Sequence, residues 1–137
     1  MSRPAGGPAH PRAHRRVLVV DDEPDIRAIT QAALQRIAGW DVLLATNGLD
    51  ALRIAADEQP EAIVLDAMMP GMDGSETARR LAADERTAHI PVLLLTAKTI
   101  ANVADLRDEL HIVAVLRKPF DPRTLATQIE HALGWNE

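Results

Sequence analysis

Polar side chains of the kind that do chemistry follow four short apolar runs of this chain. In chain order the runs are followed by Asp21-Asp22-Glu23, Asp66, Thr96 and Lys118. Each run is rich in Val, Ile and Leu, as buried strands are. If the runs are parallel strands of one sheet, their carboxyl ends meet at one edge, and these side chains lie together there.

The acids in this set predict a site for a hard divalent cation. Three carboxylates within a few ångström repel one another unless a cation lies between them, and oxygen ligands alone suit Mg²⁺. Lys118 and the Thr96 hydroxyl would favour further negative charge, such as a phosphoryl group. Asp66, alone at the end of its run, is then the natural carboxylate nucleophile and would form an acyl phosphate. Each residue alone has an ordinary structural explanation, so the prediction rests on their coincidence at four strand ends.

The elements that must position these residues alternate between strands and helices. Apolar runs predict strands at 17–20, 41–45, 62–65, 90–95 and 112–116. Helical spacing and breakers predict helices at 24–38, 49–56, 75–84, 100–110 and 121–133. This alternation is typical of an α/β fold, a parallel sheet with crossover helices.

Three of the helices carry more specific expectations. The first should bury one face formed by Ile26, Ile29, Ala33, Leu34 and Ile37. The second follows the Asn47-Gly48 turn and is marked by Leu49, Leu52, Ala55 and Ala56. The third should be capped by Ser75 or Asp73.

Length and charge narrow the class of protein. The 137 residues suffice for one domain. Residues 1–15 are rich in Pro, Gly and Arg and are expected to form a disordered basic leader, either inert or in contact with an acidic partner. Residues 1–16 hold four Arg and no acid, so the other residues carry a net charge of −9. That charge argues against direct nucleic-acid binding and favours proteins or cations as partners.

The remaining composition predicts a cytoplasmic protein without a membrane span. There is no Cys, which excludes disulfides, thiolate metal sites and Cys nucleophiles. The longest apolar stretch has the length of a strand, and the N-terminus lacks the apolar segment of a signal peptide.

Four motifs in order resemble the receiver domain of bacterial two-component response regulators over residues 16–134. They are VLVVDDEP at 17–24, IVLDAMMPGMDG at 63–74, PVLLLTA at 91–97 and LRKPF at 116–120. The resemblance implies a flavodoxin-like, doubly wound sheet of five parallel strands in the order 2-1-3-4-5, with five helices. Residues 135–137 would form a C-terminal tail.

The resemblance also implies a role for each matching residue. Asp66 would accept a phosphoryl group from a phosphohistidine of a sensor histidine kinase. Mg²⁺ would be held by the Asp22 and Asp66 side chains, the Met68 backbone carbonyl and, mainly through water, Asp21. Lys118 would pair with a phosphoryl oxygen and Thr96 would hydrogen-bond it. The Lys118-Pro119 bond would be cis, an isomer that an X-Pro amide tolerates.

One departure from the family pattern concerns the conformational switch. The family usually carries Tyr or Phe three residues before the lysine, where this chain has Val115. Its preceding Gly-Ala pair is replaced by His111-Ile112. Because Val has no ring to swing inward, the usual coupling between Thr96 and an aromatic cannot operate. We expect the signal to leave chiefly through the loop after Thr96 and the predicted helix at 100–110, unless Val115 simply fills the strand surface.

Two further positions are expected to set the lifetime of the acyl phosphate. Met68 and Lys98 lie two residues after Asp66 and Thr96, where side chains in this family tend to control the approach of water. An apolar Met68 cannot orient an attacking water, which predicts slow self-hydrolysis. Lys98 could equally be a solvated surface charge.

The preferred interpretation is a monomeric single-domain response regulator that acts by docking on a target protein or by phosphorelay to a histidine phosphotransfer protein. It would not be a turnover enzyme, although it would promote its own phosphorylation and dephosphorylation. The alternative is a degenerate receiver that binds partners without phosphorylation. A haloacid-dehalogenase-like phosphatase would need an acid two residues after Asp66, where Met68 stands, and a flavodoxin-type carrier would need a phosphate loop where Asp21-Asp22-Glu23 stands.

Overall fold

A five-stranded parallel sheet lies at the centre of the computed structural model, which describes residues 15–97 and 110–135. Its strands are β1 (Arg16–Val20), β2 (Asp41–Ala45), β3 (Ala62–Asp66), β4 (Val92–Thr96) and β5 (Ile112–Arg117). The strand order is β2-β1-β3-β4-β5, which confirms the predicted doubly wound sheet. Because the chain order reverses at β1 and β3, ligands are expected at the carboxyl ends of these two strands.

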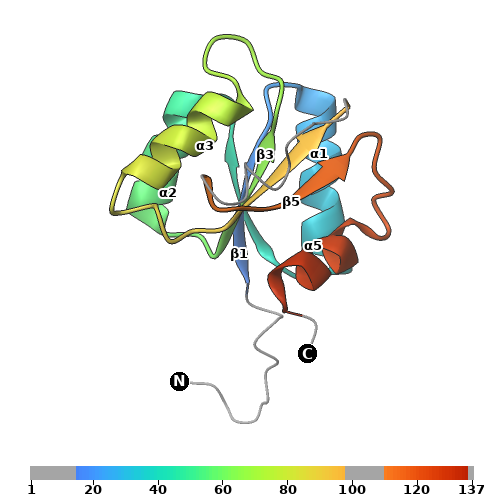
Figure 1. Ribbon diagram of the computed structural model, residues 1–137. Coiled ribbons are helices and arrows are strands. Elements are labelled where there is room, and N and C mark those ends of the chain that lie inside the picture. Colours follow the sequence, from blue (N-terminus) through green and yellow to red (C-terminus); the bar gives the residue numbers. More distant parts are fainter. Residues whose placement is uncertain (1–14, 98–109, 136–137) are drawn as a thin grey trace, which may run out of the picture.

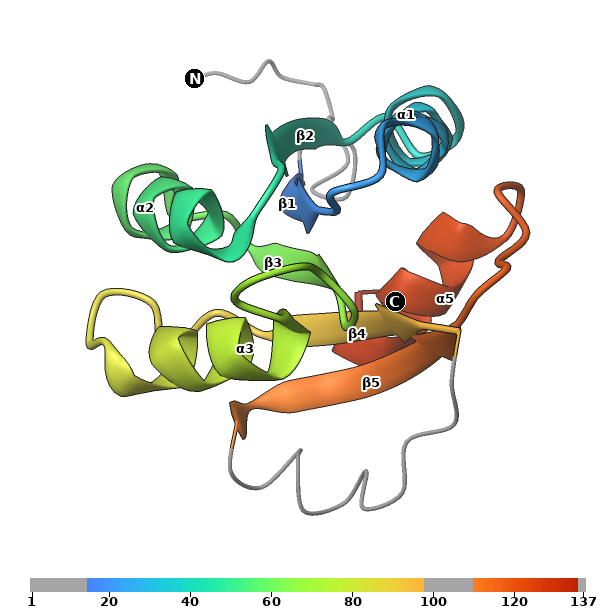
Figure 2. The ribbon, with the colours of Figure 1, turned by 90° about the horizontal axis from the view of Figure 1, so that it is seen from above.

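Helices cover both faces of the sheet (Figures 1 and 2). They are α1 (Pro24–Ala32), which continues into the π-helical segment η2 (Ala33–Ile37), α2 (Gly48–Glu58), α3 (Gly74–Ala83) and α5 (Leu125–Leu133). Figure 2 shows α1 and α5 on one face and α2 and α3 on the other. The helix predicted at 100–110 falls, except for Leu110, outside the described residues. Within the described ranges no helix is long and apolar enough to cross a membrane.

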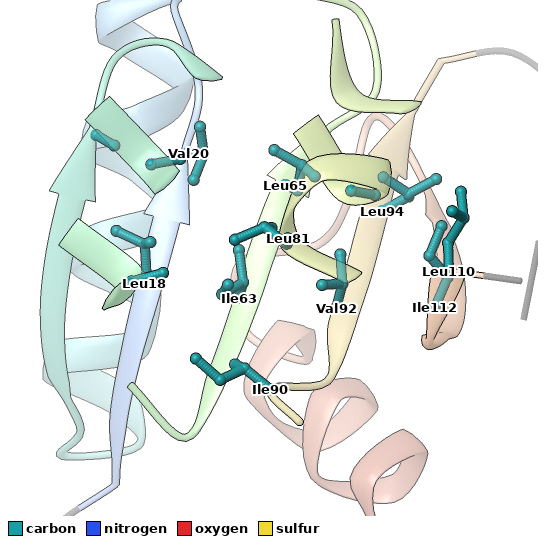
Figure 3. Packing of buried hydrophobic residues seen from close by; sticks show 14 of the residues in the cluster. Leu18, Val20, Ile63, Leu65, Leu81, Ile90, Val92, Leu94, Leu110 and Ile112 are labelled. Carbon is teal, nitrogen blue, oxygen red and sulfur yellow. The ribbon is translucent and has the colours of Figure 1, made fainter. Parts of the chain in front are cut away.

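Alternating strand residues build two separate apolar layers. On the side of α2 and α3, Leu18, Ile63, Leu65 and Leu94 pack with Leu81 of α3 (Figure 3). On the other side, the intervening strand residues pack against η2 and α5; they include Val17, Val19, Val64, Leu93 and Leu95. The inner strands β3 and β4 are buried along their whole length, so they read as continuous apolar runs rather than as alternating ones.

The buried face of the first helix differs from the prediction. Ile29 and Ile37 are 44% and 56% exposed, whereas Thr30, Ala33 and Leu34 are buried. Thr30 can replace an apolar residue there because its hydroxyl donates to the Ile26 carbonyl oxygen at 2.8 Å. The expectation for Ile37 was wrong because residues 33–37 wind as a π-helix, in which the 3.6-residue spacing no longer holds.

The second helix is present as predicted, but its packing surface is made of small residues. Leu49 is 64% exposed, and Gly48, Ala51 and Ala55 form the buried side. A Cβ at Gly48 would meet the Met72 sulfur at 2.8 Å and the Thr77 hydroxyl at still closer range. The close approach of α2 to the start of α3 therefore excludes a larger side chain at Gly48.

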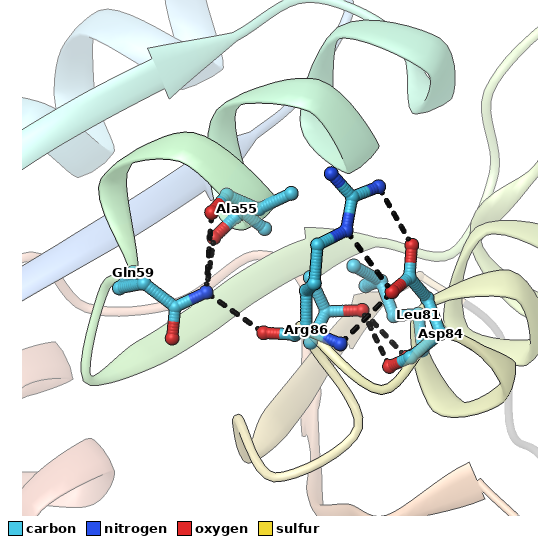
Figure 4. Close-up of polar contacts among 7 residues, drawn as sticks. Ala55, Gln59, Leu81, Asp84 and Arg86 are labelled. Carbon is cyan, nitrogen blue, oxygen red and sulfur yellow. Dashed lines mark hydrogen bonds and ion pairs between the residues drawn. The ribbon is translucent and has the colours of Figure 1, made fainter.

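Side-chain hydrogen bonds fix α2 and α3 relative to each other. Of the two predicted caps for α3, Asp73 is the one used, since its side chain accepts from the Glu76 amide. At the far end of α2, Gln59 adopts a left-handed conformation, and its side-chain amide donates to the Ala55 carbonyl and, at 2.7 Å, to the Arg86 carbonyl (Figure 4). Arg86 in turn pairs with Asp84 at 3.0 Å. This bracket joins the end of α2 to the loop after α3.

The folded body includes one residue more at each end than the predicted domain, 16–134, because of contacts around two tryptophans. The rings of Trp40 and Trp135 meet edge to face at a centroid distance of 5.4 Å. The Arg15 guanidinium lies 4.3 Å from the centroid of Trp135 and also pairs with Glu61 at 3.4 Å. Arg15, assigned above to the leader, and Trp135, assigned to the tail, thus contact the folded body. Residues 1–14 lie outside the described part of the chain.

A bulge and a strained residue open β5. Val92 pairs with Ile112, but Leu93 pairs with Ala114, so Val113 is an extra residue. The bulge resets the alternation, and Val115 packs on the α2–α3 side of the sheet with Ile112. Just before the strand, His111 has a φ of 56°, a conformation that costs residues with a Cβ about 1–2 kcal/mol. Strand β5 therefore begins at a position that suits glycine.

Replacing His111 by Gly should stabilise the protein. We expect His111→Gly to raise the free energy of unfolding by about 1 kcal/mol, because glycine adopts this φ without the steric cost of a Cβ. Urea denaturation followed by circular dichroism measures the change. The control His111→Ala retains the Cβ and should stay within a few tenths of wild type. An equal gain for both variants would show that the imidazole, and not the backbone, causes the effect.

Candidate functional site

Three carboxylates gather at the carboxyl edge of the sheet, where two neighbouring strands end. Asp21 and Asp22 follow β1, and Asp66 is the last residue of β3. One oxygen from each lies within 4.8 Å of the others. Asp21 and Asp66 are only 1% and 3% exposed, while Asp22 is partly exposed. The parallel register of β1 and β3 brings these acids together as the sequence predicts.

Lys118 joins the two buried acids from the other side. Its ammonium nitrogen lies 3.2 Å from Asp21 Oδ2 and 3.3 Å from Asp66 Oδ1, and 3.9 Å from a carboxylate oxygen of Glu23. The side chain reaches the acids from the end of β5, two strands away from β3. The Lys118-Pro119 bond that follows is cis, as predicted. One ammonium thus faces three carboxylates at short range, which leaves the cluster negatively charged.

The pKa values of the Asp66 carboxyl and the Lys118 ammonium are both shifted upward, but for different reasons. Burial raises the pKa of the Asp66 carboxyl above its usual value; the Met68 amide opposes this shift, the Asp21 charge adds to it and Lys118 opposes it. For the Lys118 ammonium, burial alone lowers the pKa, but the charges of Asp21 and Asp66 outweigh it and the net pKa is raised. The surroundings thus favour the charged form of Lys118 and disfavour the ionised form of Asp66 relative to the same groups in water.

Short hydrogen bonds orient the two buried carboxylates. The Glu23 amide donates to Asp21 Oδ1 at 2.9 Å, and the Met68 amide donates to Asp66 Oδ1 at 3.2 Å. A guanidinium nitrogen of Arg27 donates to the Asp21 backbone carbonyl at 2.9 Å. Sequence reasoning missed Arg27, which lies in the first helical turn after Pro24. The sequence could not predict this contact, because Arg27 binds a backbone carbonyl, a group that every residue has.

Gly74 is a second residue that the sequence analysis missed as part of the site. A Cβ at Gly74 would lie 2.5 Å from the Asp66 carbonyl oxygen and 2.6 Å from the Ala67 α carbon. The Gly74 amide donates to the Ala67 carbonyl at 3.1 Å. The start of α3 is therefore pressed directly against the backbone that carries Asp66, and only glycine leaves room for it.

Of the four other predicted site residues, the structure describes three, Thr96, Val115 and Met68. Thr96 ends β4 beside Asp66, is 1% exposed, and its carbonyl accepts the Lys118 amide at 2.8 Å. Val115 pairs with Leu94, so it lies diagonally across from Thr96 on one face of the sheet. Met68 is 54% exposed beside the acid cluster. Lys98 lies outside the described residues, as does the loop proposed to carry the signal.

The donor set fits Mg²⁺. Carboxylate oxygens from three residues surround one point, and among the described residues this is the group of acidic or histidine side chains close enough to share a metal ion. All the donors are hard oxygens, with no Cys in the chain. Asp22 is partly exposed, so the three carboxylates would hold the ion at a point that solvent can reach on the Asp22 side.

Comparison with known proteins agrees with this geometry. The family model described as the response regulator receiver domain matches residues 17–130. The chain belongs to the receiver-domain family of response regulators. This assignment excludes the phosphatase and flavodoxin-type alternatives considered from the sequence, and it agrees with the acids at the end of β1 and β3.

Curated relatives and solved structures place this receiver domain among response regulators. It is 39% identical over 117 residues to the phosphate regulon transcriptional regulatory protein PhoB of Pseudomonas aeruginosa, covering 85% of this chain and 51% of that protein. It is 37% identical to the alkaline phosphatase synthesis transcriptional regulatory protein PhoP of Bacillus subtilis, over 90% of this chain and 50% of that protein. The chain thus spans about half the length of these relatives.

Among solved structures, the Vibrio cholerae chemotaxis protein CheY4 superposes with a TM-score of 0.79 at 30% identity, covering 87% of this chain and 98% of that one. The receiver domain of sensor histidine kinase PA1611 from Pseudomonas aeruginosa, solved with a magnesium ion in its active site cleft, gives a TM-score of 0.76 at 26% identity over 88% and 98% of the two chains. In both comparisons the match covers nearly the whole of the solved structure.

Removing the charge of Asp66 should stabilise the metal-free protein at neutral pH. Its pKa is raised in the folded state, so folding disfavours the ionised form, and this destabilisation sets in as pH rises from about 3.8, the usual Asp value, through the folded pKa. We expect Asp66→Asn to raise the melting temperature by a few degrees at pH 7 in EDTA and to lose that advantage near pH 3. Thermal denaturation at both pH values measures the difference.

The exposed residue Asp41 provides the matched control for this charge change. It lies at the start of β2, far from the acid cluster. Asp41→Asn should change the melting temperature little at either pH. A lower melting temperature for Asp66→Asn at pH 7 would mean that the ion pair with Lys118 outweighs burial and the Asp21 charge.

Proposed function

We propose that Asp66 is a phosphoacceptor that takes a phosphoryl group from a phosphohistidine, on a sensor histidine kinase or a histidine phosphotransfer protein, with Mg²⁺ bound beside it. The observation that carries the proposal is the buried contact of Asp66 with Lys118 inside a cluster of three carboxylates. Burying uncompensated charge is costly. Two nearly unexposed acids at one edge of the sheet therefore support a role in binding charged groups, and not one in apolar packing or in binding water alone.

The proposed transfer needs little beyond charge placement. An Asp66 oxygen attacks phosphorus, a P–O bond forms, and the P–N bond to the donor histidine breaks with its electron pair left on the imidazole nitrogen. The Asp21, Asp22 and Asp66 side chains and the Met68 carbonyl would hold Mg²⁺, Asp21 mainly through water. When bound, this ion neutralises charge on the phosphoryl oxygens. A cation bound beside Asp66 would favour the ionised carboxylate, which is the form that attacks phosphorus.

Lys118 and Thr96 would stabilise the phosphorylated product. The Lys118 ammonium already touches Asp66 Oδ1 at 3.3 Å, so a phosphoryl group on that carboxylate lies within its reach after a small rotation. Thr96 is placed one strand away and would donate its hydroxyl to another phosphoryl oxygen. Both residues thus bind the same new charge from β4 and β5, which couples these strands to the chemistry.

The proposed output is docking on a target protein or onward transfer to a histidine phosphotransfer protein. The folded part of the chain is acidic, which favours such protein partners over nucleic acid. Because the same residues both form and hydrolyse the acyl phosphate, the chain would be a signalling phosphoprotein and not a turnover enzyme. The relatives named above are transcriptional regulators, and the match to them covers about half of their length.

Incubation with acetyl phosphate and Mg²⁺ tests the chemistry directly. The intact mass should rise by about 80 Da, one phosphoryl group, and the gain should need Mg²⁺. It should vanish in Asp66→Asn because the nucleophile is gone. Lys118→Met should lower the yield at least tenfold, since the product charge loses its main cation.

A degenerate receiver is the second candidate, favoured by the missing aromatic at Val115. It predicts no gain in mass with any variant. A gain that persists in Asp66→Asn would instead place the phosphoryl group elsewhere.

The control variant for the phosphorylation test is Asp73→Asn. Asp73 lies in the cap of α3 and outside the acid cluster, so this variant should be phosphorylated as wild type is.

We further propose that the switch of this receiver works without an aromatic on β5. Val115 sits beside Leu94, on the same face as Thr96, so the position is right for a switch residue but the side chain is stiff and small. Movement of Thr96 toward a phosphoryl group would therefore be passed on by packing and not by a swinging ring.

Installing a ring at this position should create a phosphorylation-dependent signal. The chain contains no Tyr, so the ring of Val115→Tyr gives unique nuclear magnetic resonance lines. We expect these lines to shift on phosphorylation as the ring moves inward. Val113→Tyr, on the opposite face of β5, is the control that should not respond. Unchanged lines in Val115→Tyr would mean that Val115 only fills the strand surface.

A further inference from the structure

Met68 differs from the other methionines that the structure describes. It is 54% exposed, whereas Met69 is 7% exposed and packs in the apolar layer with Leu65. Met72 is partly buried, and its sulfur lies 2.8 Å from where a Cβ of Gly48 would be. A reagent from solvent therefore reaches the thioether of Met68 far more easily than the other two.

Met68 lies two residues after Asp66 and contacts it through the backbone. The Met68 amide donates to Asp66 Oδ1 at 3.2 Å, so its side chain starts from a residue that is hydrogen-bonded to the reactive carboxylate. The side chain is apolar and cannot orient a water molecule. The carboxylate is 3% exposed, so water must approach it past the groups at the rim of the site.

Oxidation of its sulfur would turn the apolar Met68 side chain into a polar one. The chain has no Cys, so its four Met are the sulfur atoms that a mild oxidant can modify. A hydroperoxide transfers one oxygen atom to the sulfur, the O–O bond breaks, and water is released from hydrogen peroxide. The sulfoxide is a strong hydrogen-bond acceptor on the same flexible chain.

We infer that Met68 is a redox-modification site: hydrogen peroxide converts it to the sulfoxide, and the sulfoxide oxygen holds a water near the acyl phosphate and shortens its lifetime. The inference rests on the proposed phosphorylation of Asp66. Peroxide would then reset the signal without a separate phosphatase. Reduction by a methionine sulfoxide reductase would restore the long-lived state.

The first half of the test maps the oxidation without using phosphorylation. The protein is treated with dilute hydrogen peroxide, and the tryptic peptide from Ile54 to Arg79, which carries Met68, Met69 and Met72, is fragmented by mass spectrometry. We expect a gain of about 16 Da at Met68 about tenfold faster than at Met69. Equal rates at these residues would overturn the site assignment.

The second half measures the lifetime. Wild type is phosphorylated with acetyl phosphate and Mg²⁺, before or after peroxide treatment and removal of the peroxide, and loss of the phosphoryl mass is followed. We expect loss to be about fivefold faster after oxidation because a water is positioned. Treatment with the reductase should restore the slow rate. Met68→Asn should be fast without peroxide.

Matched variants separate the possible outcomes. Met68→Leu, apolar and without sulfur, should lose its phosphoryl group at the same rate before and after peroxide, and Met69→Leu should behave as wild type in both conditions. Acceleration by peroxide in Met68→Leu, or an unchanged lifetime in oxidised wild type, would overturn the inference. Absence of any phosphoryl gain in untreated protein would overturn the proposed function, and the lifetime effect with it, while the oxidation map would stand.

Discussion

Repulsion between buried carboxylates is the constraint on which the rest of this structure depends. Asp21 and Asp66 are almost unexposed, share one point with Asp22, and are held by the ammonium of Lys118. Negative charge in such a place is unfavourable unless cations and amide hydrogens surround it. The acids therefore repel one another at a cost in free energy, which a bound divalent cation would lower.

Several elements of the fold supply the cations and hydrogen-bond donors that surround these acids. Strand β5 delivers Lys118, α1 delivers Arg27 to the Asp21 carbonyl, and the loop after β3 delivers the Met68 amide. The start of α3 presses against the acceptor backbone at Gly74. Because these groups come from distant parts of the chain, small movements of a helix or of β5 change the electrostatics at Asp66. We propose that a charge placed on Asp66 acts on the surface of the domain through these same groups.

Sequence reasoning succeeded where the determining physics is local. Runs of branched apolar residues predicted all five strands, and their ends predicted the acids, Thr96 and Lys118. It failed where tertiary contact decides. The π-helical turn exposed Ile37, the close packing of α2 on α3 left Leu49 in solvent, and the roles of Arg27 and Gly74 depend on backbone atoms that carry no sequence signal. The bulge at Val113 also changed the face of Val115 in a way that simple alternation could not give.

The acid cluster with Lys118 is constrained differently from the residues around it. The features particular to this receiver domain lie among those surrounding residues. The proposed chemistry needs three carboxylates and one ammonium within a few ångström of one another, as they lie in this structure. Val115 and Met68 need only fill space beside that cluster, one half-buried on β5 and the other exposed next to Asp66. We propose that a stiff aliphatic side chain at the first position changes how movement is passed on, and that an exposed thioether at the second changes how water approaches. On this proposal, transmission and signal lifetime depend on residues outside the acid cluster, so either can change while the geometry of Asp66 and Lys118 stays the same.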